Sequence, residues 1–271
     1  MAQTAEFSRP PSASFASALA TQFRVIGALI LRELHTRYGR ENIGYLWMIG
    51  EPMMLASVMA LLHHSGHTQF GSDIKALPFT VLGYTTFIMF RGIVNRSEGT
   101  IEGNAPLLYH RMVTIFDLAT ARALLEFCGV FLTYVILMTL LCASGLTQPP
   151  ARPLELMLAE LLMLWMSWAQ SLIIVGGSHE NRLIERLVHP YSYFMIPLSG
   201  AFFQVEWLPE PYRSLILWLP LPHIFELARY GQFHSANLKY FDGLYLVGWC
   251  VVLTWIGLVL TRMARRRVHL H

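Results

Sequence analysis

Six long apolar stretches, separated by short polar connections, dominate the chain. Crossing about 30 Å of hydrocarbon takes roughly 20 helical residues, and stretches of about this length lie at 43–62, 77–94, 118–145, 154–176, 187–204 and 243–261. The composition agrees, because 54% of the 271 residues are hydrophobic and only 14% are charged, too few to coat a soluble protein of this size. We therefore predict an all-α integral membrane protein with six transmembrane helices and both termini on one side.

The residues before the first apolar stretch follow a helical period instead. At about 100° per residue, one stripe consists of Phe23, Gly27, Ile30, Leu31, Leu34 and Tyr38. The polar side consists of Arg24, Arg32, His35, Thr36 and Arg40. This pattern is typical of a helix that lies in the membrane interface, here 23–41, although a cytoplasmic helix obeying the positive-inside rule gives a similar one.

Basic residues are distributed unevenly between the two ends of the six stretches. Leaving out Arg9, one side holds 14 of them: Arg24, Arg32, Arg37, Arg40, Arg91, Arg96, Arg111, Arg122, Arg182, Arg186, Arg262, Arg265, Arg266 and Arg267. The other side holds five: Lys75, Arg152, Arg213, Arg229 and Lys239. The positive-inside rule then places both termini in the cytoplasm. Residues 1–22 contain no apolar core of signal-peptide type, and we expect them to form a disordered cytoplasmic tail.

The region between the fifth and sixth stretches, 205–239, is too interrupted to form a simple connection. Pro209, Pro211, Pro220 and Pro222 surround a short apolar run at 215–219. We expect short re-entrant helices here, dipping into or lying on the outer face. Broken backbone at membrane depth must be covered by protein or water, so this region should border a cavity or pore; an ordinary amphipathic surface loop is the alternative.

Few polar groups inside the apolar stretches can carry chemistry. Glu51 precedes Pro52 within the first stretch, where a carboxylate is costly unless it is paired or hydrated, so it is either a functional group or the partner of an arginine. His63, His64 and His67 cluster near the end of that stretch, but a histidine pair alone lacks the remaining ligands of a metal site. The three cysteines show no CxxC or Cys/His spacing, so we expect no metal.

Enzyme signatures are absent from the sequence. It has no GxGxxG, GxSxG or HExxH motif, and neither lysine follows a glycine, so a phosphate-binding loop of the GxxxxGK[ST] type is excluded. Energy for active work must therefore come from a partner or an ion gradient. We expect no cofactor in this chain and no nucleic-acid partner.

Three segments together resemble the permease subunit of ABC type-2 polysaccharide exporters, and most closely the capsule polysaccharide exporters of Gram-negative bacteria. They are RELHTRYGRENIGYLWMIGEPM at 32–53, NAPLLYHRMVTIFDLATARALLE at 104–126, and the proline-interrupted region before the last apolar stretch. The similarity extends from about 23 to 262, so 23–271 is expected to form one ABC type-2 transmembrane domain. One departure is that Met112, Thr114 and Ile115 stand where relatives often have a proline.

The resemblance implies a homodimer in the bacterial inner membrane with two copies of a separate cytosolic ATPase, which uses ATP and Mg²⁺. The pair would move a lipid-linked acidic polysaccharide outward through a channel at the dimer interface, with periplasmic and outer-membrane export proteins as further partners. The segment around Ser97, Glu98, Thr100, Ile101, Glu102 and Asn104 would engage the ATPase. Helix 23–41 would rim the cytoplasmic entrance, and the helices of 205–239 would lie at the exit.

Arginine chemistry suits such a substrate, because guanidinium forks bind phosphate and carboxylate in a bidentate way. We therefore expect Arg24, Arg32, Arg37 and Arg40 to attract the anionic head, and Tyr45 and Trp47 to stack against sugars just inside. Two alternatives remain open. One is an ABC type-2 exporter of another substrate, such as O-antigen, teichoic acid or a drug; the other is a membrane-embedded transferase acting on lipid-linked sugar.

Overall fold

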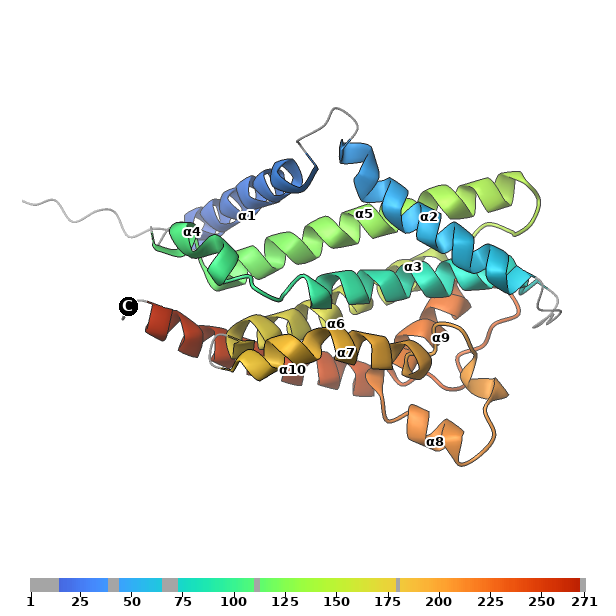
Figure 1. The fold of residues 1–271 in the computed structure, drawn as a ribbon. Helices are drawn as coiled ribbons and strands as arrows, with labels where there is room; N and C mark the ends of the chain where they lie inside the picture. Colours follow the sequence, from blue (N-terminus) through green and yellow to red (C-terminus); the bar gives the residue numbers. More distant parts are fainter. Residues whose placement is uncertain (1–14, 39–43, 65–72, 110–112, 179–180, 269–271) are drawn as a thin grey trace, which may run out of the picture.

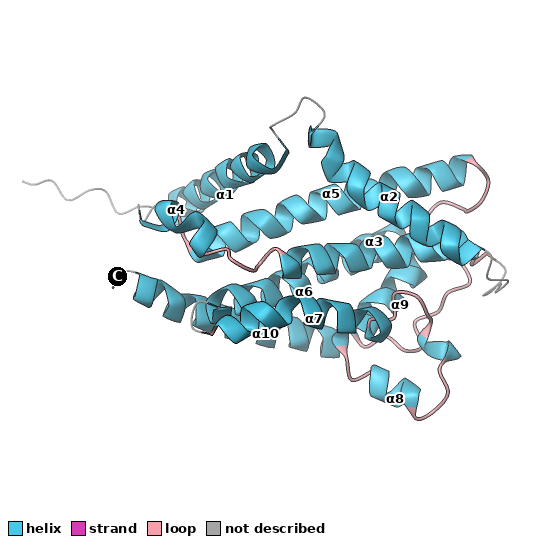
Figure 2. Cartoon of the chain, viewed as in Figure 1, coloured by secondary structure: helices cyan, strands magenta, loops and turns pink. Residues whose placement is uncertain are grey.

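The computed structural model describes residues 15–38, 44–64, 73–109, 113–178 and 181–268. All regular elements in these ranges are helices (Figure 2), which confirms the all-α prediction for this part of the chain. The longer helices are α1 (Phe15–Tyr38), α2 (Gly44–His64), α3 (Ala76–Asn95), α5 (Ile115–Ala143), α6 (Pro153–Ser178), α7 (Arg182–Leu198), α9 (Pro220–Gln232) and α10 (Gly243–Val268). The short ones are η1 (Glu102–Asn104), α4 (Ala105–Tyr109), η2 (Val205–Trp207) and α8 (Tyr212–Ile216).

The long helices form an elongated bundle with two distinct ends (Figure 1). The segment containing η1 and α4 lies at the same end as the C-terminal part of α10, and we call this the α4 end. At the opposite end, the α9 end, lie α8, α9, the end of α2 and the start of α3. The segment expected to engage an ATPase is therefore separated from α8 and α9 by the length of the bundle.

Five helices in the described ranges are long and apolar enough to cross a membrane: α1, α3, α5, α6 and α10. Helix α2 has 21 residues with Pro52 inside it, and α7 has 17 residues, with Pro190 and Pro197 inside it. The predicted fifth stretch, 187–204, thus differs from α7, which begins earlier and ends at Leu198. The chain turns there because Gly200 adopts a φ of +84°, a left-handed conformation that favours glycine.

Helix α1 begins at Phe15 rather than at the predicted residue 23. Its first turns contain Ala16, Ala18, Leu19 and Ala20, which are strong helix formers. The Gln22 amide also donates a hydrogen bond to Asp117 on α5. Residues 15–22, which were expected to belong to the tail, are therefore helical; residues 1–14 lie outside the described residues.

Two apolar cores hold the bundle together. The larger one centres on α6, where Met163 and Met166 are fully buried. Helix α10 packs closely on α6, since a Cβ at Gly257 would come within 2.6 Å of the Leu172 Cβ. The smaller core lies at the α4 end. It joins α1 to the segment 101–109 and to the adjacent ends of α5, α6 and α10 through Ile26, Leu29, Ile101, Leu108, Ile115, Leu118, Ala121, Val175 and Ala264.

The α9 end is fastened by buried polar contacts. Arg229 of α9 pairs with Glu226 at 3.0 Å, donates to the carbonyl oxygens of Gly200 and Ala201, and places its guanidinium carbon 4.5 Å from the centre of the Phe79 ring. Glu226 also accepts a hydrogen bond from the Val205 backbone N–H. These contacts bind α9 to α3 and to the turn that follows α7.

Asp73 fastens the link before α3 to the segment after α9. Burial alone would raise the pKa of Asp73, but hydrogen bonds from the Ser235 hydroxyl and from the backbone N–H groups of His234 and Ser235 outweigh that effect and lower the pKa below 3.8. Because the pKa of Asp73 is lower in the folded than in the unfolded protein, its hydrogen bonds stabilise the fold fully at pH values above the unfolded-state pKa. This stabilisation is lost as the pH falls through the folded-state pKa.

We expect Asp73→Asn to destabilise the protein at pH 7, and the difference from wild type to shrink as the pH falls below about 4. Thermal unfolding in detergent between pH 3 and pH 7 measures both effects. Lys239→Gln, an exposed change in the same region, is the control. A difference between Asp73→Asn and wild type that stays constant across this pH range would contradict the assignment.

Candidate functional site

Two carboxylates near the α4 end, Glu33 and Glu126, form ion pairs with arginines of α1, of α5 and of the C-terminal end of α3. Glu33 of α1 is 9% exposed. Its carboxylate lies 2.7 Å from Arg37 Nη2, 3.2 Å from Arg122 Nε and 3.7 Å from Arg32 Nη2. Because Arg122 belongs to α5 and the other two arginines to α1, this cluster ties α1 to α5.

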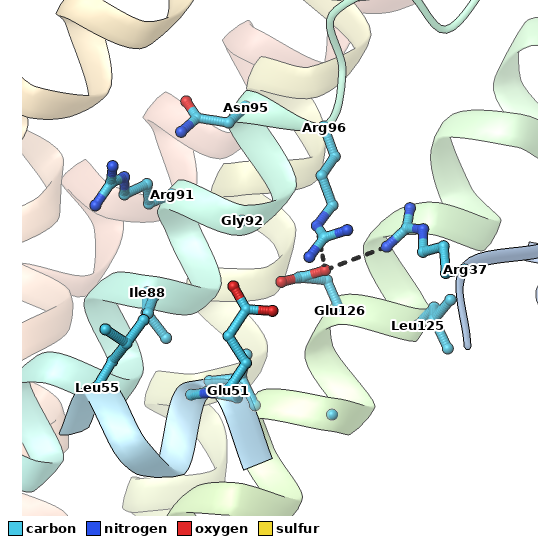
Figure 3. Close-up of a pocket in the computed structure, with 13 residues that line it drawn as sticks. Arg37, Glu51, Leu55, Ile88, Arg91, Gly92, Asn95, Arg96, Leu125 and Glu126 are labelled. Carbon is cyan, nitrogen blue, oxygen red and sulfur yellow. Dashed lines mark ion pairs between the residues drawn. The ribbon is translucent and has the colours of Figure 1, made fainter. Parts of the chain in front are cut away.

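Glu126 of α5 extends the network to α3. Its Oε2 lies 2.7 Å from Arg96 Nε and 3.5 Å from Arg37 Nη1, and Figure 3 shows both guanidinium groups converging on it. Gly92 of α3 makes this possible, since a Cβ there would overlap the Glu126 carboxylate. A side chain at this position would displace the Glu126 carboxylate from the place where it meets Arg96 and Arg37.

The same arginines hold the segment that follows α3. Arg122 Nη1 donates to the Arg96 carbonyl oxygen at 3.0 Å and to Thr100 Oγ1 at 2.7 Å. Arg32 donates to Asn104 Oδ1, whose amide nitrogen in turn donates to the Thr100 carbonyl oxygen at 2.9 Å. A displacement of this segment would thus pull directly on both α1 and α5.

A cavity of about 270 Å³ opens beside this network, between α2, α3 and α5. Its polar lining consists of Arg37, Glu51, Arg91, Asn95, Arg96 and Glu126, and apolar walls are supplied by Leu55, Ile88, Leu125 and Val130. Figure 3 shows the Glu51 side chain projecting from α2 toward Glu126. The site can therefore contact a ligand that is polar and charged on one side and apolar on the other.

A model of the ABC-2 type transporter family matches residues 24–233. The chain belongs to this family. It is 36% identical to the capsule polysaccharide export inner-membrane protein CtrC of Neisseria meningitidis serogroup B, over 91% of this chain and 93% of CtrC. BexB of Haemophilus influenzae, also a capsule polysaccharide export inner-membrane protein, is 34% identical over 92% and 94%. The polysialic acid transport protein KpsM of Escherichia coli is 33% identical over 88% and 92%. The resemblance seen in the sequence is thereby confirmed.

The arginines expected at the substrate entrance of this ABC-2 subunit lie in different surroundings. Arg24 is exposed and contacts only its own helix among the described residues, at the Ala20 carbonyl oxygen and the Thr21 hydroxyl. Arg32 and Arg37 belong to the carboxylate network. Arg40 lies outside the described residues. The structure thus leaves Arg24 open to solvent, whereas Arg32 and Arg37 hold other parts of the protein.

The other residues expected at the entrance belong to α2. The Trp47 side chain is 54% exposed, and the Tyr45 side chain lies outside the described residues. Glu51 is exposed and lines the cavity. The arginine partner that the sequence led us to expect is not found among the described residues, with none of which Glu51 forms an ion pair. His67 and the side chains of His63 and His64 lie outside the described residues.

The segment expected to engage an ATPase divides into a buried and a more exposed set. Ser97, Thr100, Ile101 and Asn104 are buried and face the bundle. Glu102 is exposed and Glu98 is half-buried, with its carboxylate 3.2 Å from His189 Nε2 of α7. The carboxylates at 98 and 102 are therefore the groups of this segment most available to a partner.

Glu33, Arg91, Asn95 and Arg122 were not recognised as site residues from the sequence. The i,i+4 spacing of Glu33 and Arg37 was a detectable signal, because such pairs share a helix face. The remaining contacts join residues far apart in the chain, such as Glu33 with Arg122 and Arg32 with Asn104. Only the packing of α1 and α3 against α5 brings them together.

Proposed function

We propose that this ABC-2 subunit is the membrane permease of an ATP-driven exporter that moves capsular polysaccharide from the cytoplasm across the bacterial inner membrane. The observation that carries the proposal is the match with CtrC and BexB, which extends over more than nine tenths of this chain and of each relative. As an ABC-2 membrane subunit the chain is a transporter component and not an enzyme. ATP and Mg²⁺ are used by a separate ATPase subunit.

The proposed arrangement has two copies of the permease, two ATPases and a lipid-linked acidic chain as cargo. We assign α2, α3, α5, α6, α7 and α10 as the six spans and α1 as the interfacial helix, with both termini cytoplasmic. The charge distribution supports this choice, because α1 contains Arg24, Arg32, Glu33 and Arg37 whereas Glu51 is the one Asp, Glu, Lys or Arg in α2. We assign α8 and α9 as re-entrant helices at the outer exit of the channel. Periplasmic and outer-membrane export proteins would receive the polysaccharide there.

The coupling role of residues 97–104 is supported by their position at the α4 end and by their hydrogen bonds to Arg32 and Arg122. We expect Glu98→Arg with Glu102→Arg to leave the permease folded but to reduce export at least about tenfold, because reversed charge opposes ATPase docking. Co-purification of the ATPase, ATP hydrolysis and surface capsule are measured together. Glu185→Arg on α7 is the matched control. Unchanged ATPase docking and export in the double variant would exclude this role.

The entrance role of α1 is tested by replacing Arg24, Arg32, Arg37 and Arg40 with Gln, singly and together. If Arg24 and Arg40 attract the anionic head, their variants lose export while the thermal stability stays that of wild type. Arg32→Gln and Arg37→Gln should lower export and thermal stability together, since these arginines also contact Asn104, Glu33 and Glu126. Capsule export and thermal unfolding of the purified permease distinguish the two classes. Full export in the Arg24 and Arg40 variants would remove them from the entrance.

A further inference from the structure

Two charged side chains of the cavity, Glu51 of α2 and Arg91 of α3, form no ion pair with any described residue. Arg37 and Arg96, in contrast, share Glu126. A third group is also unsatisfied, because Asn95 Oδ1 is buried without a hydrogen-bond partner. In Figure 3, Arg91 and Asn95 project from α3 on the side away from Arg96. The cavity thus contains three groups without such a partner: Glu51, which projects toward Glu126, and Arg91 and Asn95, which project to the other side of α3.

The unpaired groups specify the chemistry of a ligand. A carboxylate and an amide oxygen are hydrogen-bond acceptors, so Glu51 and Asn95 call for hydroxyl donors. The guanidinium group of Arg91 calls for a carboxylate or a phosphate, which it can bind in a bidentate way. A carboxylate within an apolar helix and a buried unpaired amide oxygen are both unfavourable on their own. A polyhydroxylated ligand with one anionic group satisfies all three.

Size and surroundings narrow the choice further. At about 270 Å³ the cavity is close to the lower limit of roughly 300 Å³ for small-molecule sites, which suits one sugar residue or one headgroup rather than a longer chain segment. The Arg91 guanidinium carbon lies 4.4 Å from the centre of the Tyr193 ring, and Tyr193 is 55% exposed. Tyr193 is outside the cavity lining but stacks against the Arg91 guanidinium and so helps to position its charge. That charge has no acidic partner among the described residues, and an acidic sugar or a glycerol phosphate would supply one.

We propose that the cavity between α2, α3 and α5 binds the anionic, hydroxyl-rich end of the exported glycolipid. Arg91 pairs with its carboxylate or phosphate, and Glu51 accepts hydrogen bonds from its hydroxyl groups. This inference rests on the proposed function. It moves anion recognition from the arginines of α1, two of which hold carboxylates of the chain itself, to α3.

The test uses the complete permease–ATPase complex in lipid nanodiscs. A labelled trimer of sialic acid supplies sugar carboxylates, short-chain phosphatidylglycerol supplies a phosphate beside glycerol hydroxyls, and maltotriose is the neutral probe. We expect Arg91→Gln to weaken binding of at least one anionic probe about tenfold or more, Arg91→Lys to weaken it less, and Glu51→Gln to weaken it about threefold or more. The probe that responds identifies the source of the anion. Arg265→Gln and Glu185→Gln, away from the cavity, should bind as wild type does.

Several results would overturn the site. The first is that wild type binds neither anionic probe. The second is that Arg91→Gln binds both anionic probes as tightly as wild type does. The third is that Glu51→Gln binds a probe more weakly only because its subunits associate more weakly with each other. Restoration of export by Glu51→Arg combined with Arg91→Glu would show instead that the two side chains pair with each other in another conformation. Export by wild type is measured in parallel. If Arg91→Gln loses binding of an anionic probe but wild type exports no capsule, the proposed function is refuted while the binding site stands.

Discussion

Arg229→Met should destabilise the protein by about 3–5 kcal/mol, because it leaves the Glu226 carboxylate buried without its cation. The Arg229 side chain is 3% exposed and that of Glu226 is 9% exposed, so water cannot replace the lost contact. The carbonyl oxygens of Gly200 and Ala201 would also lose a donor. The free energy of unfolding can be measured by SDS titration in mixed micelles, followed by tryptophan fluorescence.

A double-mutant cycle separates the ion pair from the other contacts of Arg229. Glu226→Gln in the Arg229→Met background removes the unpaired charge, so the double variant should recover part of the lost stability but not the hydrogen bonds to Gly200 and Ala201. Lys239→Met is the matched control, because Lys239 is exposed and its loss should cost less than about 0.5 kcal/mol. A loss below about 1 kcal/mol in Arg229→Met would show that this ion pair does not hold α9 in place.

The apolar pattern predicted most of the helices well, because length and hydropathy leave few alternatives for a segment of about 20 apolar residues. The predicted stretches at 77–94 and 154–176 lie within α3 and α6. The prediction failed locally where conformation depends on single residues. The turn at Gly200 ends α7 before 204, and the Thr114–Asp117 capping box starts α5 at Ile115, before the predicted 118.

The candidate site was less accessible from the sequence. The excess of arginine at one end of the apolar stretches was visible in the sequence. The sequence could not indicate which of these arginines would form ion pairs with carboxylates of the same chain. Arg37 serves both Glu33 and Glu126, whereas Arg91 contacts no acid among the described residues. Both facts depend on how α1 and α3 pack against α5. An arginine count therefore predicts orientation in the membrane, and three-dimensional structure is needed to decide which cations can meet a substrate.

Packing ties α1 firmly to the rest of the described bundle. It contributes Ile26 and Leu29 to the smaller core, whereas Phe23 and Leu31 of the predicted apolar stripe are exposed. Glu33 and Arg37 reach α5. Arg32 holds Asn104 in the segment proposed to engage the ATPase. A movement of that segment must therefore move α1, break the Arg32–Asn104 contact, or both. Contiguous ion pairs and hydrogen bonds of this kind are one means by which coupling is carried between distant sites.

Glu126→Gln should uncouple ATP hydrolysis from export, because Arg37 and Arg96 would lose the carboxylate that joins α1 to α3 through α5. A coupling free energy of about 1–3 kcal/mol corresponds to a five- to 150-fold change, so we expect export to fall at least about tenfold while ATP hydrolysis persists. The stability loss should be moderate, about 1–3 kcal/mol, since the Arg96 side chain is 35% exposed and water can take over part of its contact.

Gly92→Ala should reproduce this defect without changing any charge, because the added methyl group would occupy the place of the Glu126 carboxylate. Gly27→Ala on α1 is the matched control, since a Cβ there meets nothing within 4 Å and should only favour the helix. Export, ATP hydrolysis and thermal unfolding of the three variants are compared with wild type. If Gly92→Ala exports normally while Glu126→Gln does not, the carboxylate acts through its charge in the cavity and not through its contact with Arg96 and Arg37. If both variants export normally, the network around Glu126 plays no part in coupling.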